Sequence, residues 1–139
     1  IDAVDNATHL IMNKTMRRRL TAAARNTAVG GYITYEQDAF GRQVTKYNDL
    51  PILIVDKDNT NTDILGFTEA SSTTSIYVVS FGDGAVTGLQ NGGMDVRDIG
   101  ELETKPSYRT RVEWYNGFGV FAPRSASRLN LITNAAVTA

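Results

Sequence analysis

The sequence predicts an α+β fold built on a central mixed β-sheet. Apolar residues recur at helical spacing in Met16, Leu20 and Ala23, which favours one amphipathic helix. Residues 52–55 are apolar throughout, as in a strand that is buried on both faces. At 139 residues, with 42% hydrophobic and 21% charged, the chain has the composition of one globular domain or part of one. The side chains expected in the core are Met16, Leu20, Ile52, Ile54, Ile76, Val78 and Trp114.

The first half of the chain predicts a strand, a helix, a hairpin and a second buried strand. Residues 9–12 form a short apolar strand, and Asn13 is a suitable N-cap for a helix to about Asn26. The glycine pair at 30–31 is expected to end that helix. Residues 32–36 and 42–47 predict two strands of a hairpin around a turn at 39–41.

The second half predicts extended segments separated by turns. After a polar loop at 56–63, strands at 75–81 and 85–90 flank the tight-turn dipeptide Asp83-Gly84. Residues 91–93 are another break. In the late run, Arg109, Arg111 and Glu113 alternate with apolar residues, which indicates a strand with one covered face. The dipeptide at 116–117 permits a type I′ hairpin and equally permits one strand that is bent or bulged there.

Catalytic and metal-binding patterns are weak. The absence of cysteine excludes disulfides and thiol chemistry, and the lone His9 lies in an apolar strand without a serine–carboxylate constellation. Positions 56, 58, 60 and 62 alternate like calcium ligands, but Asn61 and Phe67 replace the required glycine and glutamate. We therefore expect no enzymatic activity, no cofactor and no tightly bound metal.

The charge pattern argues against nucleic-acid binding as the main function. The net charge is -1, so no overall positive field attracts nucleic acid. The three consecutive arginines at 17–19 would point in different directions around a helix, and no aromatic residues lie between them. A solvated or subunit-contacting face is the better interpretation. No apolar run reaches the length of a membrane span.

The order of these segments resembles the C-terminal half of a tailed-bacteriophage major capsid protein. The matching pieces are the strand-to-helix junction at 10–13, the run at 49–56, the strand at 75–82 and the late strand that ends in Pro123-Arg124-Ser125-Ala126. Asp49 stands where the family usually has glycine, and Ala122 stands where an arginine often precedes the proline. Together the motifs span nearly the whole chain.

The resemblance implies the shell-building fold that tailed phages share with encapsulins. Residues 1–107 would form the axial domain, a central mixed sheet flanked by helices, and residues 108–139 would form a long strand returning to the peripheral domain and the C-terminal tail. The N-terminal arm, the extended loop and the spine helix of the family would precede Ile1. The implied function is structural and non-enzymatic: self-assembly into the icosahedral shell that encloses the genome. An encapsulin-like shell, or a tail or adhesion binding module, is the alternative.

The resemblance also implies partners and a location. Other copies of the chain are the main partners, with scaffolding or portal proteins as further ones; packaged DNA would be contacted only indirectly, and no membrane is involved. The protein would assemble in the host cytoplasm and reside in the virion. The candidate contacts between copies are Arg17, Arg18 and Arg25 on the helix and Asp56, Asp58 and Asp63 in the polar loop. Such exposed charges predict a monomer or a small ring that loosens with salt.

Overall fold

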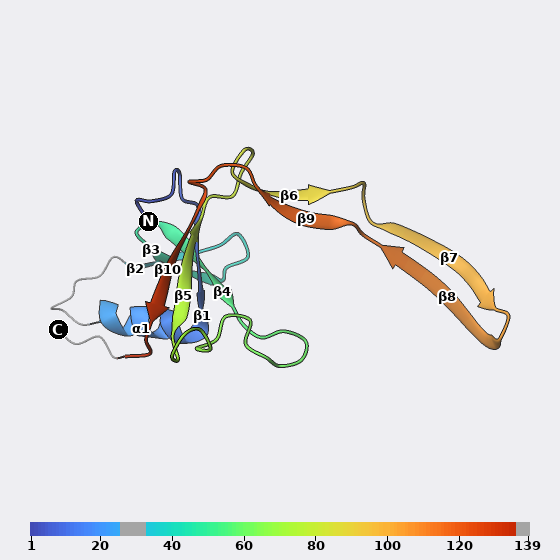
Figure 1. The fold of residues 1–139 in the computed structure, drawn as a ribbon, viewed down its shortest axis with the longest axis horizontal. Helices are drawn as coiled ribbons and strands as arrows, with labels where there is room; N and C mark the ends of the chain where they lie inside the picture. The colour runs from blue at the N-terminus through green and yellow to red at the C-terminus, as the bar shows by residue number, and fades with distance from the viewer. Residues whose placement is uncertain (26–32, 136–139) are drawn as a thin grey trace.

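The computed structural model describes residues 1–25 and 33–135, which form a sheet body and a projecting arm. We define the sheet body as residues 1–80 and 122–135 of the described chain, and the projecting arm as residues 82–121. Figure 1 shows the arm leaving one corner of the body and extending away from it. The chain enters the arm after β5 and returns from it into β10.

The sheet body is a six-stranded sheet of order β10-β5-β1-β4-β3-β2. β1 runs parallel to β4, and the other neighbouring pairs are antiparallel, which confirms the central mixed sheet. The strands are β1 (His9–Asn13), β2 (Ile33–Gln37), β3 (Gln43–Tyr47), β4 (Leu50–Val55), β5 (Thr74–Val79) and β10 (Ala126–Ile132). The part of the chain described here contains one helix, α1 (Lys14–Ala24), rather than the several flanking helices expected.

Asn13 starts the helix and ties it to the sheet. Its side-chain Oδ1 accepts a hydrogen bond from the Met16 backbone N at 2.8 Å, as predicted for an N-cap. Its Nδ2 donates to the carbonyl oxygen of Leu65 at 3.0 Å and to Thr74 Oγ1 at 3.2 Å. One buried amide therefore joins α1, β5 and the loop between β4 and β5. The helix ends at Ala24, with Arg25 as its C-cap, close to the end expected near residue 26. The glycine pair at 30–31 lies outside the described residues.

The core lies where α1 covers one face of the sheet. Leu10 of β1 is paired with Ile52 of β4 and with Val78 of β5, so these three side chains form a row across the sheet. Val4, Met12 and Met16 complete the buried cluster. Of the predicted core, Met16, Ile52 and Val78 are buried, and Leu20 and Ile76 pack against them half-buried.

Two predicted core residues are exposed instead. Ile54 is 42% exposed, and Leu53 on the opposite face of β4 is equally so, because the described residues leave this end of the strand uncovered on both faces. An apolar run alone does not say how many of its faces another layer covers. Trp114 is 51% exposed because it lies in the projecting arm, away from the core.

The projecting arm consists of two antiparallel ribbons in series. In the first, β6 (Val86–Gln90) pairs with β9 (Asn116–Val120). In the second, β7 (Asp95–Leu102) pairs with β8 (Lys105–Glu113). Gly117 lies opposite Leu89 of β6, so the hairpin alternative at 116–117 is wrong and the late run is one path interrupted at residues 114–115. The axial–peripheral division expected at residue 107 falls inside β8.

Two features of the arm differ from the sequence-based expectation. The turn at Asp83-Gly84 forms, with Gly84 at φ +74°, but the strands around it share only an isolated bridge between Phe81 and Val86. β5 pairs within the body, and β6 pairs with β9. The strand β7 was not predicted. Val96, Ile99 and Leu102 recur every three residues in the sequence, so the two-residue period of a strand is not visible. In the structure a bulge interrupts the strand between Asp98 and Gly100.

The turn between β3 and β4 holds two residues in the left-handed conformation. Tyr47 pairs with Leu50 across a two-residue turn, and its central residues Asn48 and Asp49 have φ of 50° and 63°. This is the left-handed conformation that a type I′ turn requires at both positions. Asparagine and aspartate tolerate it better than other side chains, and glycine adopts it without strain.

A polar cluster fixes the far edge of the sheet. Glu69 Oε2 accepts hydrogen bonds from Ser75 Oγ at 2.5 Å and from Arg128 Nη2 at 2.7 Å. Arg128 Nε donates to Ser75 Oγ at 2.9 Å, and its guanidinium lies 5.9 Å from the centre of the Tyr77 ring. These bonds connect the loop before β5 to both β5 and β10. The hydrogen bonds from Ser75 and then Arg128 hold the pKa of Glu69 below its ordinary value of 4.5.

The left-handed turn predicts an order of stability at position 49. Asp49→Gly should raise the free energy of unfolding by about 0.5 kcal/mol, because removed backbone strain exceeds the added entropy of the unfolded chain. Asp49→Ala should lower it by about 1 kcal/mol, because alanine cannot hydrogen-bond locally in this conformation. Urea unfolding of the three proteins measures both effects. An alanine variant as stable as the parent would contradict this account of the turn.

The Glu69 cluster predicts a loss of stability in acid. Because the pKa of Glu69 is lowered in the folded protein, its contribution is complete above pH 4.5 and is lost as the pH falls through the folded pKa. Glu69→Gln should therefore flatten the fall of the unfolding midpoint below pH 4.5. The matched control is Glu103→Gln, which changes an exposed carboxylate at the tip of the arm. Identical pH profiles for Glu69→Gln and the parent would refute the role of the cluster.

Candidate functional site: the projecting arm

The projecting arm exposes a surface that the described chain does not cover. Each ribbon has two strands, and within residues 33–135 neither ribbon is hydrogen-bonded to a third strand. A two-stranded ribbon cannot bury its own faces and is marginal in water by itself. Figure 1 shows both ribbons lying clear of the sheet body. The arm therefore presents unpaired strand edges and open faces to its surroundings.

Apolar side chains are concentrated on this arm. More than half of the exposed large hydrophobic residues of the described chain lie there: Leu89, Met94, Val96, Ile99, Tyr108, Val112, Trp114, Tyr115, Phe118, Val120 and Phe121. Val96 and Val112 are directly opposite each other and about 60% exposed. Tyr108, an even number of residues from Val112 on β8, shares that face of the ribbon.

Such an accumulation indicates an interaction surface. Single exposed apolar residues are common on protein surfaces, whereas contiguous groups mark contacts with other molecules. Burying one valine or phenylalanine side chain stabilises a contact by roughly 1.5–3 kcal/mol. The apolar residues of the arm therefore supply enough surface for a stable protein contact once another layer covers them.

The base of the arm is held in a defined direction. The Phe121 backbone N donates to the Ala85 carbonyl oxygen at 2.9 Å, and the Ser80 backbone N donates to the Ser125 carbonyl oxygen at 2.8 Å. Above this base, a Cβ atom on Gly119 would lie only 3.0 Å from the Phe121 ring and 3.2 Å from Leu89. A side chain at position 119 would therefore force Phe121 and Leu89 to shift. The arm thus leaves the body along a path that backbone bonds and close packing specify.

The candidate contacts expected on the helix lie in different environments. Arg18 is exposed, with Nη2 3.4 Å from Thr15 Oγ1. Arg17 is half-buried, and its carbonyl oxygen accepts a hydrogen bond from Thr21 Oγ1. Arg25, at the other end of the helix, lines a depression formed with the β2–β3 hairpin. These arginines therefore do not form one basic patch.

The candidate contacts expected in the polar loop are partly engaged within the chain. Asp56 forms an ion pair with Lys14, so the loop begins beside the first residue of α1. Asp58 accepts hydrogen bonds from the Thr60 hydroxyl and from the backbone N of Thr60 and Thr62, which lowers its pKa. Asp63 is exposed. The threonines that were compared with calcium ligands thus serve to order the loop around Asp58.

His9 has local packing partners. Its ring meets the Phe81 ring edge-on at a centroid distance of 5.3 Å, and its Nδ1 lies 3.0 Å from Thr8 Oγ1. Among residues 1–25 and 33–135, no three His, Cys, Asp or Glu side chains are grouped closely enough to hold a metal ion. The helix that the structure describes is not long and apolar enough to cross a membrane.

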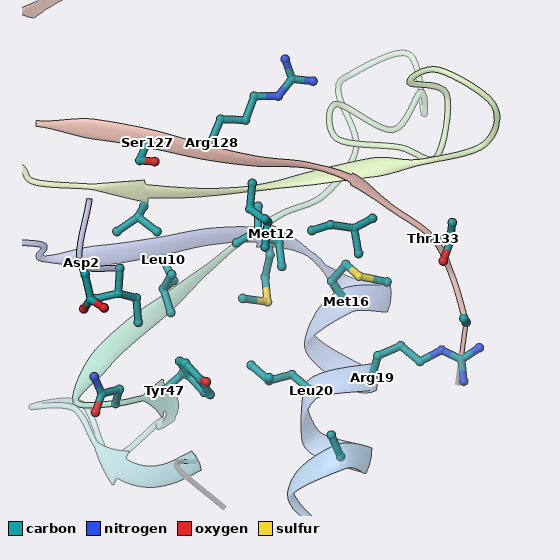
Figure 2. A pocket seen from close by; sticks show the side chains of 18 residues that line it. Asp2, Leu10, Met12, Met16, Arg19, Leu20, Tyr47, Ser127, Arg128 and Thr133 are labelled. Atoms are coloured by element: carbon teal, nitrogen blue, oxygen red, sulfur yellow. The ribbon is translucent and has the colours of Figure 1, made fainter. Parts of the chain in front are cut away.

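A cavity of about 760 Å³ lies between α1 and the adjoining sheet face (Figure 2). Met16 and Leu20 of the helix and Leu10 and Met12 of β1 form its apolar wall. Arg19 lies at one side, where its side chain donates to Asn134 Oδ1 at 3.0 Å. The lining is continuous with the core, so this cavity is an incompletely covered part of the sheet face.

Comparison with known proteins gives a structural match. No protein-family model and no curated protein sequence matches the chain. Among solved structures, it is similar to the chain in the cryo-EM structure of the holo-SrpI encapsulin complex from Synechococcus elongatus PCC 7942, with a TM-score of 0.65 and 16% identity. The similarity covers 96% of this chain and 47% of that chain, so this chain spans about half the length of the encapsulin.

At 16% identity the match shows the fold alone. It confirms the coarser expectation, a fold like that of an encapsulin shell protein, and it covers the arm as well as the sheet body, since 96% of the chain is matched. The arm was the part that sequence patterns located least well. The sequence pattern that pointed to the arm is the alternation of Val112 and Trp114 with charged residues, which indicates a strand with one covered face.

Removing apolar surface from the arm should weaken self-association without unfolding the protein. We expect Val112→Lys combined with Phe118→Lys to lower the weight-average mass in concentrated solution, because both side chains are exposed and in separate ribbons. The unfolding free energy should change by about 0.5 kcal/mol or less per site, as for ordinary surface positions. Multi-angle light scattering and thermal unfolding measure the two effects.

The matched control is Phe40→Lys, which removes an equally exposed aromatic residue from the tip of the β2–β3 hairpin in the sheet body. This variant should associate like the parent. Equal association of the arm variant and the parent would show that the arm is not the interaction surface.

Proposed function

We propose that this chain is a structural subunit of a self-assembling protein shell. The observation that carries the proposal is the projecting arm, whose apolar residues are left uncovered by the described chain although its base is firmly built. A surface of this kind is completed by other protein. Repeated copies of one subunit offer such a surface at every position of a closed shell.

The fold supports this role. A match over 96% of the chain to a protein of an encapsulin complex is what a shell subunit would give, although many functions can share one fold. The sheet body would form a compact unit around one symmetry axis, and the arm would carry contacts to neighbouring copies. Because each contact is repeated across the shell, weak individual contacts suffice for a stable assembly.

The finer hypothesis is a bacteriophage major capsid protein whose shell encloses the genome. It rests on the order of the sequence motifs, including the β3–β4 turn at which the left-handed Asp49 replaces the family glycine. Scaffolding and portal proteins would be its further partners, and assembly would take place in the host cytoplasm. An encapsulin-like compartment is the alternative, favoured by the structural match. In both cases the role is structural and non-enzymatic.

Electron microscopy of the complete gene product tests the proposal. We expect closed shells of uniform size, since the same contacts are repeated by symmetry. Nuclease treatment followed by extraction separates the two shell types, because a genome-enclosing shell protects DNA and a compartment of the other type retains protein. The arm variant Val112→Lys with Phe118→Lys should reduce the yield of shells, and Phe40→Lys should not.

A product that stays monomeric at every concentration and binds one specific ligand would overturn the shell role. It would favour the tail or adhesion module instead. For residues 1–139 alone, we expect a monomer or a small ring without closed shells, measured by light scattering over a range of protein and salt concentrations.

A further inference from the structure

The outer ribbon of the arm carries like charges directly opposite each other. The register pairs Asp95 with Glu113 and, two residues along each strand, Arg97 with Arg111. Paired residues in an antiparallel ribbon point to the same face, where like charges repel each other. One face of β7–β8 therefore carries an acidic row, Asp95 and Glu113, beside a basic row, Arg97 and Arg111. We name this the two-row face.

Contacts within the ribbon partly compensate this repulsion. Arg97 Nε donates to Asp95 Oδ2 at 2.6 Å, and Arg111 forms an ion pair with Glu113. Both bonds run along a strand and join the two rows. Arg97 and Arg111 nevertheless remain 69% and 61% exposed, and each guanidinium has further donors available for a second carboxylate. The two-row face thus has charge left to offer a partner.

We propose that the two-row face binds the same face of a second copy of this chain, in antiparallel orientation about a two-fold axis. The axis would run across the strands, midway between the acidic and the basic row. Rotation about it places the acidic row of each copy over the basic row of the other. This inference adds a specific contact to the proposed shell role. It rests on that role, because the shell is what brings copies of the chain next to each other.

The geometry of a β-ribbon suits this contact. The rows are two residues apart along each strand, which is about 7 Å, and faces of sheets stack about 10 Å apart. Arginine and carboxylate side chains can span that separation together. Asp95 would meet Arg97 of the second copy, and Glu113 would meet Arg111 of the second copy. Because the axis is two-fold, each of these pairs forms twice.

The charge pattern selects a second copy over other partners. A nucleic acid would be attracted by the basic row but repelled by the acidic row. A uniformly charged protein surface would meet the same conflict. A partner must present an acidic row and a basic row at the same spacing in the opposite direction, and the two-row face of another copy presents this pattern. Arg109, which lies opposite Gly100, extends the basic side of the face.

Charge reversal tests the proposal. In the complete gene product, Asp95→Lys with Glu113→Lys makes the face wholly basic, and Arg97→Glu with Arg111→Glu makes it wholly acidic. For each variant alone, we expect an association constant about tenfold below that of the parent, or lower, in sedimentation equilibrium at low salt. A 1:1 mixture should regain association, and native mass spectrometry should identify mixed dimers by their mass.

The mixture separates association from folding. Both variants lose the bonds within their own ribbon, and mixing two misfolded proteins would not restore those bonds. A matched control exchanges the rows, with Asp95→Arg, Arg97→Asp, Arg111→Glu and Glu113→Arg. This protein keeps the pattern with its signs reversed, so it should associate like the parent. In each case added salt should weaken the association, because it screens exposed charges.

The outcomes distinguish this inference from the shell role. Reversed variants that associate as strongly as the parent, or a mixture that forms no mixed dimers, would overturn the two-row contact. Closed shells from the wholly basic variant would also overturn the two-row contact, but they would leave the shell role intact. Mixed dimers from a product that never forms shells would support the contact and refute the shell role.

Discussion

The pairing of β10 with β5 is the constraint on which the rest of the structure depends. Ala126 lies opposite Val79 and Leu129 opposite Ile76, so the end of the chain returns to the strand that it left before entering the arm. The backbone bond from Ser80 to Ser125 closes this junction, and Ser125 is buried there. Both ends of residues 82–121 are therefore fixed side by side. A segment held in this way must run out and back, and here it does so as paired antiparallel strands.

This constraint divides the molecule into parts with different sources of stability. The sheet body has a core, in which Leu10, Ile52 and Val78 pack beneath α1, and it has buried polar ties such as Asn13. The arm has strand pairing but little burial. Its stability therefore depends on what covers it, which is why we interpret its exposed faces as contact surfaces rather than as ordinary solvent-facing surface.

The two faces of the outer ribbon offer different kinds of contact. On one face of the outer ribbon, Val96 and Val112 present apolar surface, which stabilises any well-fitting contact. On the other face, the two rows of charge add little energy but restrict which partner fits and in which direction. A subunit that must bind its own copies in one geometry needs both properties. The apolar surface would provide affinity, and the two-row face would provide register.

The sequence by itself determined the local structure of the sheet body. The N-cap Asn13, the helical spacing of Met16 and Leu20, and the β2–β3 hairpin were all predicted correctly, because caps, periodicity and turns act over a few neighbouring residues. Tertiary structure alone decided which strands pair and which faces are covered. The exposure of Ile54, the pairing of β6 with β9, and the opposition of Asp95 to Glu113 all depend on residues that are distant in sequence. A local pattern does not encode such register, since it arises only when the strands are brought together by the fold.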